Sequence, residues 1–253
     1  LDFPIVNNDM FSIIMFGDVA GMLPYLREPI SDGTSTVDAG FVVDALYNAD
    51  AATDELPLNN YGIAAGLMGN IFIADYRLEY RNYRGTFKPG FYGTNYDRVR
   101  AAYATELKSN LLDPQATEPV MGIYGEAGFT IGDKFRFEAG YMWPWESDLE
   151  PSDDDQLHLE AEIFSGLIPV VDIHGSISYD RTQFAPTLLG DDPNLSLFDA
   201  NTVLKGELIY PVAPSLDLAV LVTTTVAHDD DGNVMLDTES GKPQINPSIS
   251  IET

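Results

Sequence analysis

Alternation of apolar and polar residues, sustained over segments of about 10 to 13 residues, constrains this chain more than any other feature. Between residues 69 and 81, one set of positions holds Phe72, Ala74, Tyr76, Leu78 and Tyr80, and the positions between them hold Asp75, Arg77, Glu79 and Arg81. Because successive side chains of a β-strand point to opposite faces, this pattern predicts a strand with one apolar face and one charged face. The same alternation recurs near residues 121–130, 135–143, 157–163, 171–180, 204–210, 216–226 and 245–251. We therefore expect an all-β fold.

The length of these segments separates two kinds of β protein. Strands of soluble proteins usually contain about 5 or 6 residues, whereas about 9 to 11 tilted residues cross a lipid bilayer. The apolar runs of the chain are far shorter than the ~20 residues of a membrane-spanning helix, so strands would have to make any crossing. Aromatic residues near the expected strand ends, such as Tyr80, Trp143 and Tyr179, match the interfacial girdles of membrane barrels. The sequence predicts a single transmembrane β-barrel domain over residues 1–253.

The predicted connections between strands alternate in length. Short turns near residues 132–133, 165–169 and 211–214 interleave with long acidic loops at 144–155, 181–200 and 228–243. We count about eleven strands, including two over residues 10–24 and 38–47 with apolar residues on both faces and one over residues 94–108. The expectation is an antiparallel up-and-down barrel of about 10–14 strands.

The sequence combines three features: the repeated two-faced strands, the alternating loop lengths and the final strand Ile245-Asn246-Pro247-Ser248-Ile249-Ser250-Ile251-Glu252. They resemble the bacterial outer-membrane β-barrel (porin-like) class. The resemblance implies an outer-membrane location, contact with the lipid bilayer, passage of small polar solutes or ions, and a homo-oligomer or other envelope proteins as partners. Members of the class commonly end on an aromatic residue and have an even number of strands, whereas this chain ends at Glu252-Thr253. The chain also opens at Leu1 without an initiator methionine, and we expect it to be processed or to be the C-terminal portion of a larger barrel.

Charge and composition exclude some classes of function. The chain has 40 acidic and 13 basic residues, and its formal net charge of −27 would repel nucleic acid. It has no cysteine, so disulfides and thiolate chemistry are excluded. Acidic clusters fall in the expected loops at Asp153-Asp154-Asp155, Asp191-Asp192 and Asp229-Asp230-Asp231. They predict either simple solvation or weak binding of divalent cations such as Ca²⁺, and no other cofactor is expected.

Seven of the 13 basic residues lie between Arg77 and Lys108. If residues 69–83 and 94–108 are adjacent antiparallel strands, acidic and basic side chains share an inward face. The predicted pore-lining residues are Asp75, Arg77, Glu79, Arg81, Arg98, Arg100 and Glu106. Opposed charges across a lumen would screen small polar solutes. The alternative is that these charges pair with one another in a plugged interior.

The histidines supply the candidate metal and catalytic residues. With a turn at residues 165–169, pairing would bring His158 opposite His174 and Glu160 opposite Asp172, which predicts a cation or zinc site; the alternative is a solvated lumenal face. His174, Ser176 and Asp172 are also the residue types of a hydrolase triad, but they are spread by ~7 Å per step along one strand face and no nucleophile elbow is present. We therefore expect no enzyme activity.

Three functional interpretations remain open. The first is a porin-like channel. The second is a non-conducting structural or surface-interaction barrel that acts through acidic external loops. The third is a soluble β-barrel ligand binder with its apolar stripes buried, which solubility without detergent would favour.

Overall fold

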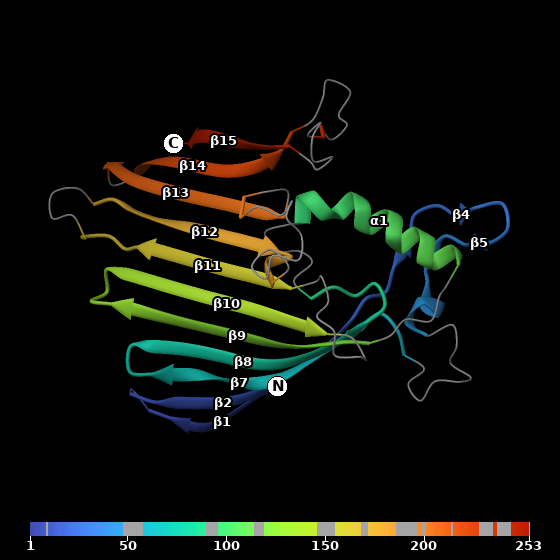
Figure 1. Cartoon of the computed structure of the whole chain (residues 1–253), viewed down its shortest axis with the longest axis horizontal. Helices are drawn as coiled ribbons and strands as arrows, with labels where there is room; N and C mark the ends of the chain where they lie inside the picture. Colours follow the sequence, from blue (N-terminus) through green and yellow to red (C-terminus); the bar gives the residue numbers. More distant parts are fainter. Residues whose placement is uncertain are drawn as a thin grey trace.

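The computed structural model describes residues 1–8, 10–47, 58–89, 96–113, 119–145, 155–167, 172–185, 197–198, 201–213, 215–227, 235–236 and 244–252. One antiparallel sheet of eleven strands dominates this part of the chain, and its spatial order follows the sequence (Figure 1). In that order the strands are β1 (Asp2–Asn7), β2 (Ser12–Gly21), β7 (Tyr61–Ile71), β8 (Ala74–Arg84), β9 (Val120–Ile131), β10 (Phe135–Trp145), β11 (Gln156–Ile163), β12 (His174–Thr182), β13 (Thr202–Ala213), β14 (Leu216–Val226) and β15 (Ile245–Glu252). The predicted mostly-β, up-and-down antiparallel architecture is confirmed.

Connections between the strands of this sheet alternate in length as the sequence predicts, with one exception. At one end, called the short-connection end, they are residues 8–11, 72–73, 132–134, 164–173 and 214–215, and at the other, the long-connection end, they are residues 22–60, 85–119, 146–155, 183–201 and 227–244. The exception is that residues 146–155 and 164–173 have ten residues each, whereas the other connections have two to four residues at the short-connection end and 18 to 39 at the long-connection end. Because every pairing is antiparallel, successive connections lie at opposite ends of the sheet.

Small elements gather beyond the long-connection ends of the strands (Figure 1). They are the pair β3 (Tyr25–Leu26) with β6 (Gly40–Phe41), the pair β4 (Ile30–Ser31) with β5 (Thr36–Val37), the 3₁₀ helix η1 (Val43–Leu46) and the helix α1 (Tyr96–Leu112). Among the described residues, no helix has the length and apolar character needed to cross a membrane.

Asn60 and Thr86 anchor these elements to the sheet. The side-chain oxygen of Asn60 accepts hydrogen bonds from the backbone N–H of Thr86 at 2.7 Å and from its hydroxyl at 2.9 Å. The side-chain amide of Asn60 donates to the carbonyl of Ala45, within η1, at 2.6 Å. The Tyr103 hydroxyl of α1 donates to the carbonyl of Thr86. Since Asn60, Thr86 and Tyr103 are all buried, this network fixes the start of β7, η1 and α1 relative to one another.

Two expected strands are wrong. Residues 38–47 contain only the two-residue β6 and the helix η1, and residues 96–112 form α1. The second segment is rich in alanine, leucine, glutamate, lysine and arginine, which are strong helix formers, and it lacks period-two alternation. The count of eleven is still reached, because β1 and β7 take the places of the two misassigned segments.

Closure of the sheet into a barrel is not found. β1 and β15 form its two edges, and the described residues contain no pairing between them. With eleven antiparallel strands the first and last run in the same direction, so a direct β1–β15 pair would be parallel.

The two faces of the sheet differ in chemistry and exposure. On the apolar face, Leu78 is 54% exposed and Ile177 is 51% exposed. On the opposite face Glu79 is 2% exposed, and the buried apolar residues Phe16 and Met142 lie on this same face. Soluble proteins usually show the reverse arrangement, with charges outside and large aliphatic side chains inside. The closest packing in this sheet is therefore on its charged face.

Candidate functional site

Strand pairing brings charged side chains from β8 to β12 onto one continuous surface. We call this surface the charged face; its acidic, arginine and histidine residues on these five strands are Asp75, Arg77, Glu79, Arg81, Glu126, Arg136, Glu138, His158, Glu160, Glu162, His174 and Asp180. Register determines which of them meet: Arg77 lies opposite Glu126, Glu138 opposite Glu160, and His158 opposite Asp180. Directly paired residues of antiparallel strands point to the same side of the sheet.

Glu79 bridges the two arginines of β8. Its Oε2 accepts hydrogen bonds from Nε and Nη2 of Arg77 at 2.8 and 2.7 Å, and its Oε1 is bound by Arg81. Arg77 also lies over the ring of Phe16 at 4.8 Å, and Arg81 lies over the ring of Tyr124 at 4.1 Å. Both guanidinium groups are therefore held by a carboxylate and an aromatic ring at once.

Arg136 of β10 links its own strand to β8 across β9. Its Nη1 and Nη2 donate to the two oxygens of Asp75, each at 2.8 Å, and Nη2 also donates to Glu138 at 2.6 Å. The contact between β10 and β8 crosses β9 at Gly128, where a Cβ would lie 2.7 Å from both Arg136 and Asp75. The absence of a side chain at Gly128 permits this bidentate pair.

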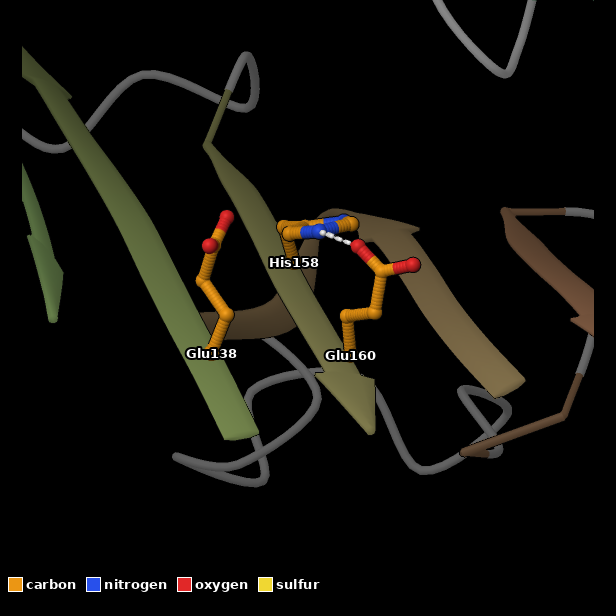
Figure 2. Close-up of side chains that lie close together, drawn as sticks. All are labelled: Glu138, His158 and Glu160. Carbon is orange, nitrogen blue, oxygen red and sulfur yellow. Dashed lines mark ion pairs between the residues drawn. The ribbon is translucent and has the colours of Figure 1, made fainter. Parts of the chain in front are cut away.

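His158 stands among three carboxylates. Its Nδ1 lies 2.7 Å from Oδ1 of Asp180, and its Nε2 lies 3.6 Å from Oε2 of Glu160. Figure 2 shows Glu138 on one strand, and His158 and Glu160 on the next. One ligand atom from each of Glu138, His158 and Glu160 lies within 4.8 Å of the others. We call these three residues the histidine cluster.

Of the predicted metal set, the structure brings together only His158 and Glu160. His158 pairs with Asp180 rather than with His174, and Glu160 pairs with Ser178 rather than with Asp172. The expected register is wrong by six residues, because residues 164–173 connect β11 to β12 where a shorter turn was expected. Asp172 and His174 lie toward the short-connection end of the sheet, away from His158.

The predicted pairing of residues 94–108 with β8 is also wrong. Arg98, Arg100 and Glu106 lie in α1, and β8 pairs instead with β7 and β9. Glu106 contacts Lys88 at 3.6 Å. The charged face also carries residues outside the predicted site, which are Tyr124, Glu126, Arg136, Glu138, Glu162 and Asp180. Their alternation was visible in the sequence, but their proximity depends on strand registers that it does not specify.

The electrostatic balance of the charged face favours cations. From β8 to β12 it carries seven carboxylates, at positions 75, 79, 126, 138, 160, 162 and 180, against three arginines, at 77, 81 and 136. The arginines lie on β8 and β10, so the excess of negative charge falls toward β11 and β12. Of the predicted acidic clusters, residues 153–154, 191–192 and 229–231 lie outside the described residues. Asp155 is buried and not solvated, and it accepts hydrogen bonds from the Tyr141 hydroxyl and from the backbone N–H groups of Phe184 and Ala185.

Comparisons with known proteins add no homologue to this description. No protein-family model matches the chain, and neither a curated protein nor a solved structure matches it.

Proposed function

We propose that this chain forms most or all of an outer-membrane β-barrel, and that its charged face lines a water-filled passage for small polar solutes or ions. The observation that carries the proposal is the inverted distribution of side chains. Large aliphatic residues such as Leu78 and Ile177 are exposed, while Glu79 is buried on the opposite face and bound by two arginines. Lipid on one side accounts for the exposed aliphatic residues, and the polar interior of a barrel accounts for the charged residues on the other.

Strand length supports a membrane setting. β7, β8, β10 and β14 each contain 11 residues, and β9 and β13 contain 12. At about 3.3 Å per residue, an 11-residue strand is about 36 Å long. Tilted by about 45°, it spans about 26 Å, close to the apolar band of about 25 Å on membrane barrels.

The charge balance supports selectivity for cations. Seven carboxylates against three arginines give the β8–β12 part of the charged face an excess of four negative charges when its histidines are neutral. Rings of acidic side chains favour cations in pores, and rings of basic side chains favour anions. A hollow of about 290 Å³ beside Glu79 and Arg81 leaves room for water on this face.

A non-conducting barrel is the second candidate, and the ion pairs favour it. Arg77 and Arg81 share Glu79, and Arg136 binds both Asp75 and Glu138. Charges satisfied within the protein can fill an interior as well as line a passage. In that case the barrel would act through its long acidic loops.

Single-channel recording in planar bilayers distinguishes these candidates. The proposal predicts discrete conductance steps with cation selectivity. Arg77→Gln should increase the selectivity and Glu160→Gln should reduce it, because each changes the charge of the passage by one unit. The matched control is Arg27→Gln, which removes one positive charge from an exposed site outside the eleven-stranded sheet and should change nothing.

Two other outcomes would reject the channel. Insertion into the bilayer without conductance would favour the structural barrel. A chain that stays folded and monodisperse without detergent would favour the soluble ligand binder.

A further inference from the structure

We propose that the histidine cluster (Glu138, His158 and Glu160) binds a divalent transition metal of the zinc type. It offers one imidazole nitrogen and two carboxylates, a set that suits Zn²⁺ and related ions. The proposal concerns binding only and does not depend on whether the protein conducts.

Strand pairing positions the ligands before any metal arrives. Glu138 and Glu160 are directly opposite each other on β10 and β11, and His158 is two residues from Glu160 on the same face. Their ligand atoms lie within 4.8 Å of one another. Three ligands at about 2.0 Å from a tetrahedral zinc would be about 3.3 Å apart. Rotation of two flexible glutamate side chains can supply that contraction without a change in the sheet.

Residues around the cluster hold two of the ligands in suitable orientations. The carboxylate of Asp180, 2.7 Å from Nδ1 of His158, accepts hydrogen bonds only, so that nitrogen carries the proton. In the neutral imidazole, the form that binds a metal, the lone pair is then on Nε2, the atom that faces Glu160. Arg136 binds Oε2 of Glu138 at 2.6 Å, which leaves Oε1 for a metal. A carboxylate behind a histidine ligand is the usual arrangement in zinc sites.

Charge and access both suit a divalent cation. Glu138, Glu160 and Asp180 carry three negative charges, and Arg136 is the base that contacts this group. The net charge of these four residues is −2, which a divalent ion would neutralise. The His158 side chain is 30% exposed, so an aqueous ion can reach it.

Zn²⁺ binding to the whole chain, purified in detergent, tests the proposal. Zn²⁺ binding would be measured by calorimetry in the presence of millimolar Mg²⁺. The Mg²⁺ occupies sites made only of carboxylates and leaves the site that contains an imidazole free for Zn²⁺. We expect one Zn²⁺ per chain. His158→Asn and Glu160→Gln should each weaken binding at least tenfold, and Asp180→Asn should weaken it by roughly 10- to 100-fold. His174→Asn is the matched control, because it removes a histidine from the same face outside the cluster.

Two results would overturn the proposal. One is the absence of tight Zn²⁺ binding by the wild type. The other is an equal affinity in wild type and in folded His158→Asn or Glu160→Gln. Far-UV circular dichroism identifies which variants fold, and Co²⁺ bound in place of Zn²⁺ reports nitrogen ligation through its visible spectrum, which should change in His158→Asn and not in His174→Asn.

Discussion

Substitution of arginine for a residue in the middle of the apolar face tests whether that face contacts lipid or water. Leu78 is the fifth residue of β8 (Ala74–Arg84), is 54% exposed and pairs with Gly125 of β9. Ile131 ends β9 on the same face and is 51% exposed, so it has nearly the same exposure at a different depth. We expect Leu78→Arg to destabilise the folded protein in lipid far more than Ile131→Arg does.

The expected magnitude follows from depth. Ile131 is six residues beyond Gly125, the partner of Leu78, because 131 − 125 = 6. At about 3.4 Å per residue this is about 20 Å along the strand, and about 14 Å of depth at a tilt of about 45°. Arginine facing lipid costs about 2–4 kcal/mol at the bilayer midplane and about 0–1 kcal/mol near the interface. The difference between the two variants should therefore be about 2–3 kcal/mol.

Reversible urea unfolding in phospholipid vesicles measures this difference. On a water-exposed face, both substitutions would stay within about 0.5 kcal/mol of wild type. A Leu78→Arg variant as stable as wild type, or as stable as Ile131→Arg, would refute the argument.

Three further predictions concern the charged face and the close packing of strands. Glu79→Gln should lower the free energy of unfolding by about 3 kcal/mol in urea titrations, because it leaves Arg77 and Arg81 without their shared carboxylate. The control Glu207→Gln, at an exposed position, should have no measurable effect. Gly66→Ala should destabilise the protein by about 1–3 kcal/mol, because its Cβ would lie 2.2 Å from the Leu78 carbonyl oxygen, and Gly125→Ala, whose Cβ has its nearest neighbour at 3.9 Å, should be tolerated. Zn²⁺ should lower the single-channel conductance of wild type and leave that of His158→Asn unchanged. Equal changes in conductance in the two proteins would show that the zinc site does not lie in the passage.

The sequence predicts the strands whose two faces differ most. β8 to β12 alternate apolar with charged residues, so their faces could be assigned from residues such as Arg77 and Glu138 alone. β7 was missed because its positions on the charged face are uncharged: Gly62, Ala64, Gly66, Met68 and Asn70. Both glycines have a packing reason: a Cβ at Gly62 would meet Phe87, and one at Gly66 would meet the backbone of β8. Close packing thus removed the alternation on which the prediction depended.

The site was less predictable than the fold, because it depends on register. Arg77, Glu79 and Arg81 come from one strand, and their common face follows from spacing. The partners of His158 lie on two other strands, and a connection of unexpected length moved Asp180 into the position where His174 was expected. Arg98 and Arg100 lie in helix α1 and are not part of the sheet.

Cysteine scanning of β8 in lipid vesicles tests the central claim, which is that the apolar face contacts lipid and the charged face contacts water. The chain has no native cysteine, so each introduced thiol is unique. We expect Tyr76→Cys, Leu78→Cys and Tyr80→Cys to be quenched by a lipid-soluble quencher after labelling, and Asp75→Cys and Arg77→Cys to react with a water-soluble reagent. Equal reaction with the water-soluble reagent on both faces, or apolar positions shielded from lipid as well as from water, would contradict the account.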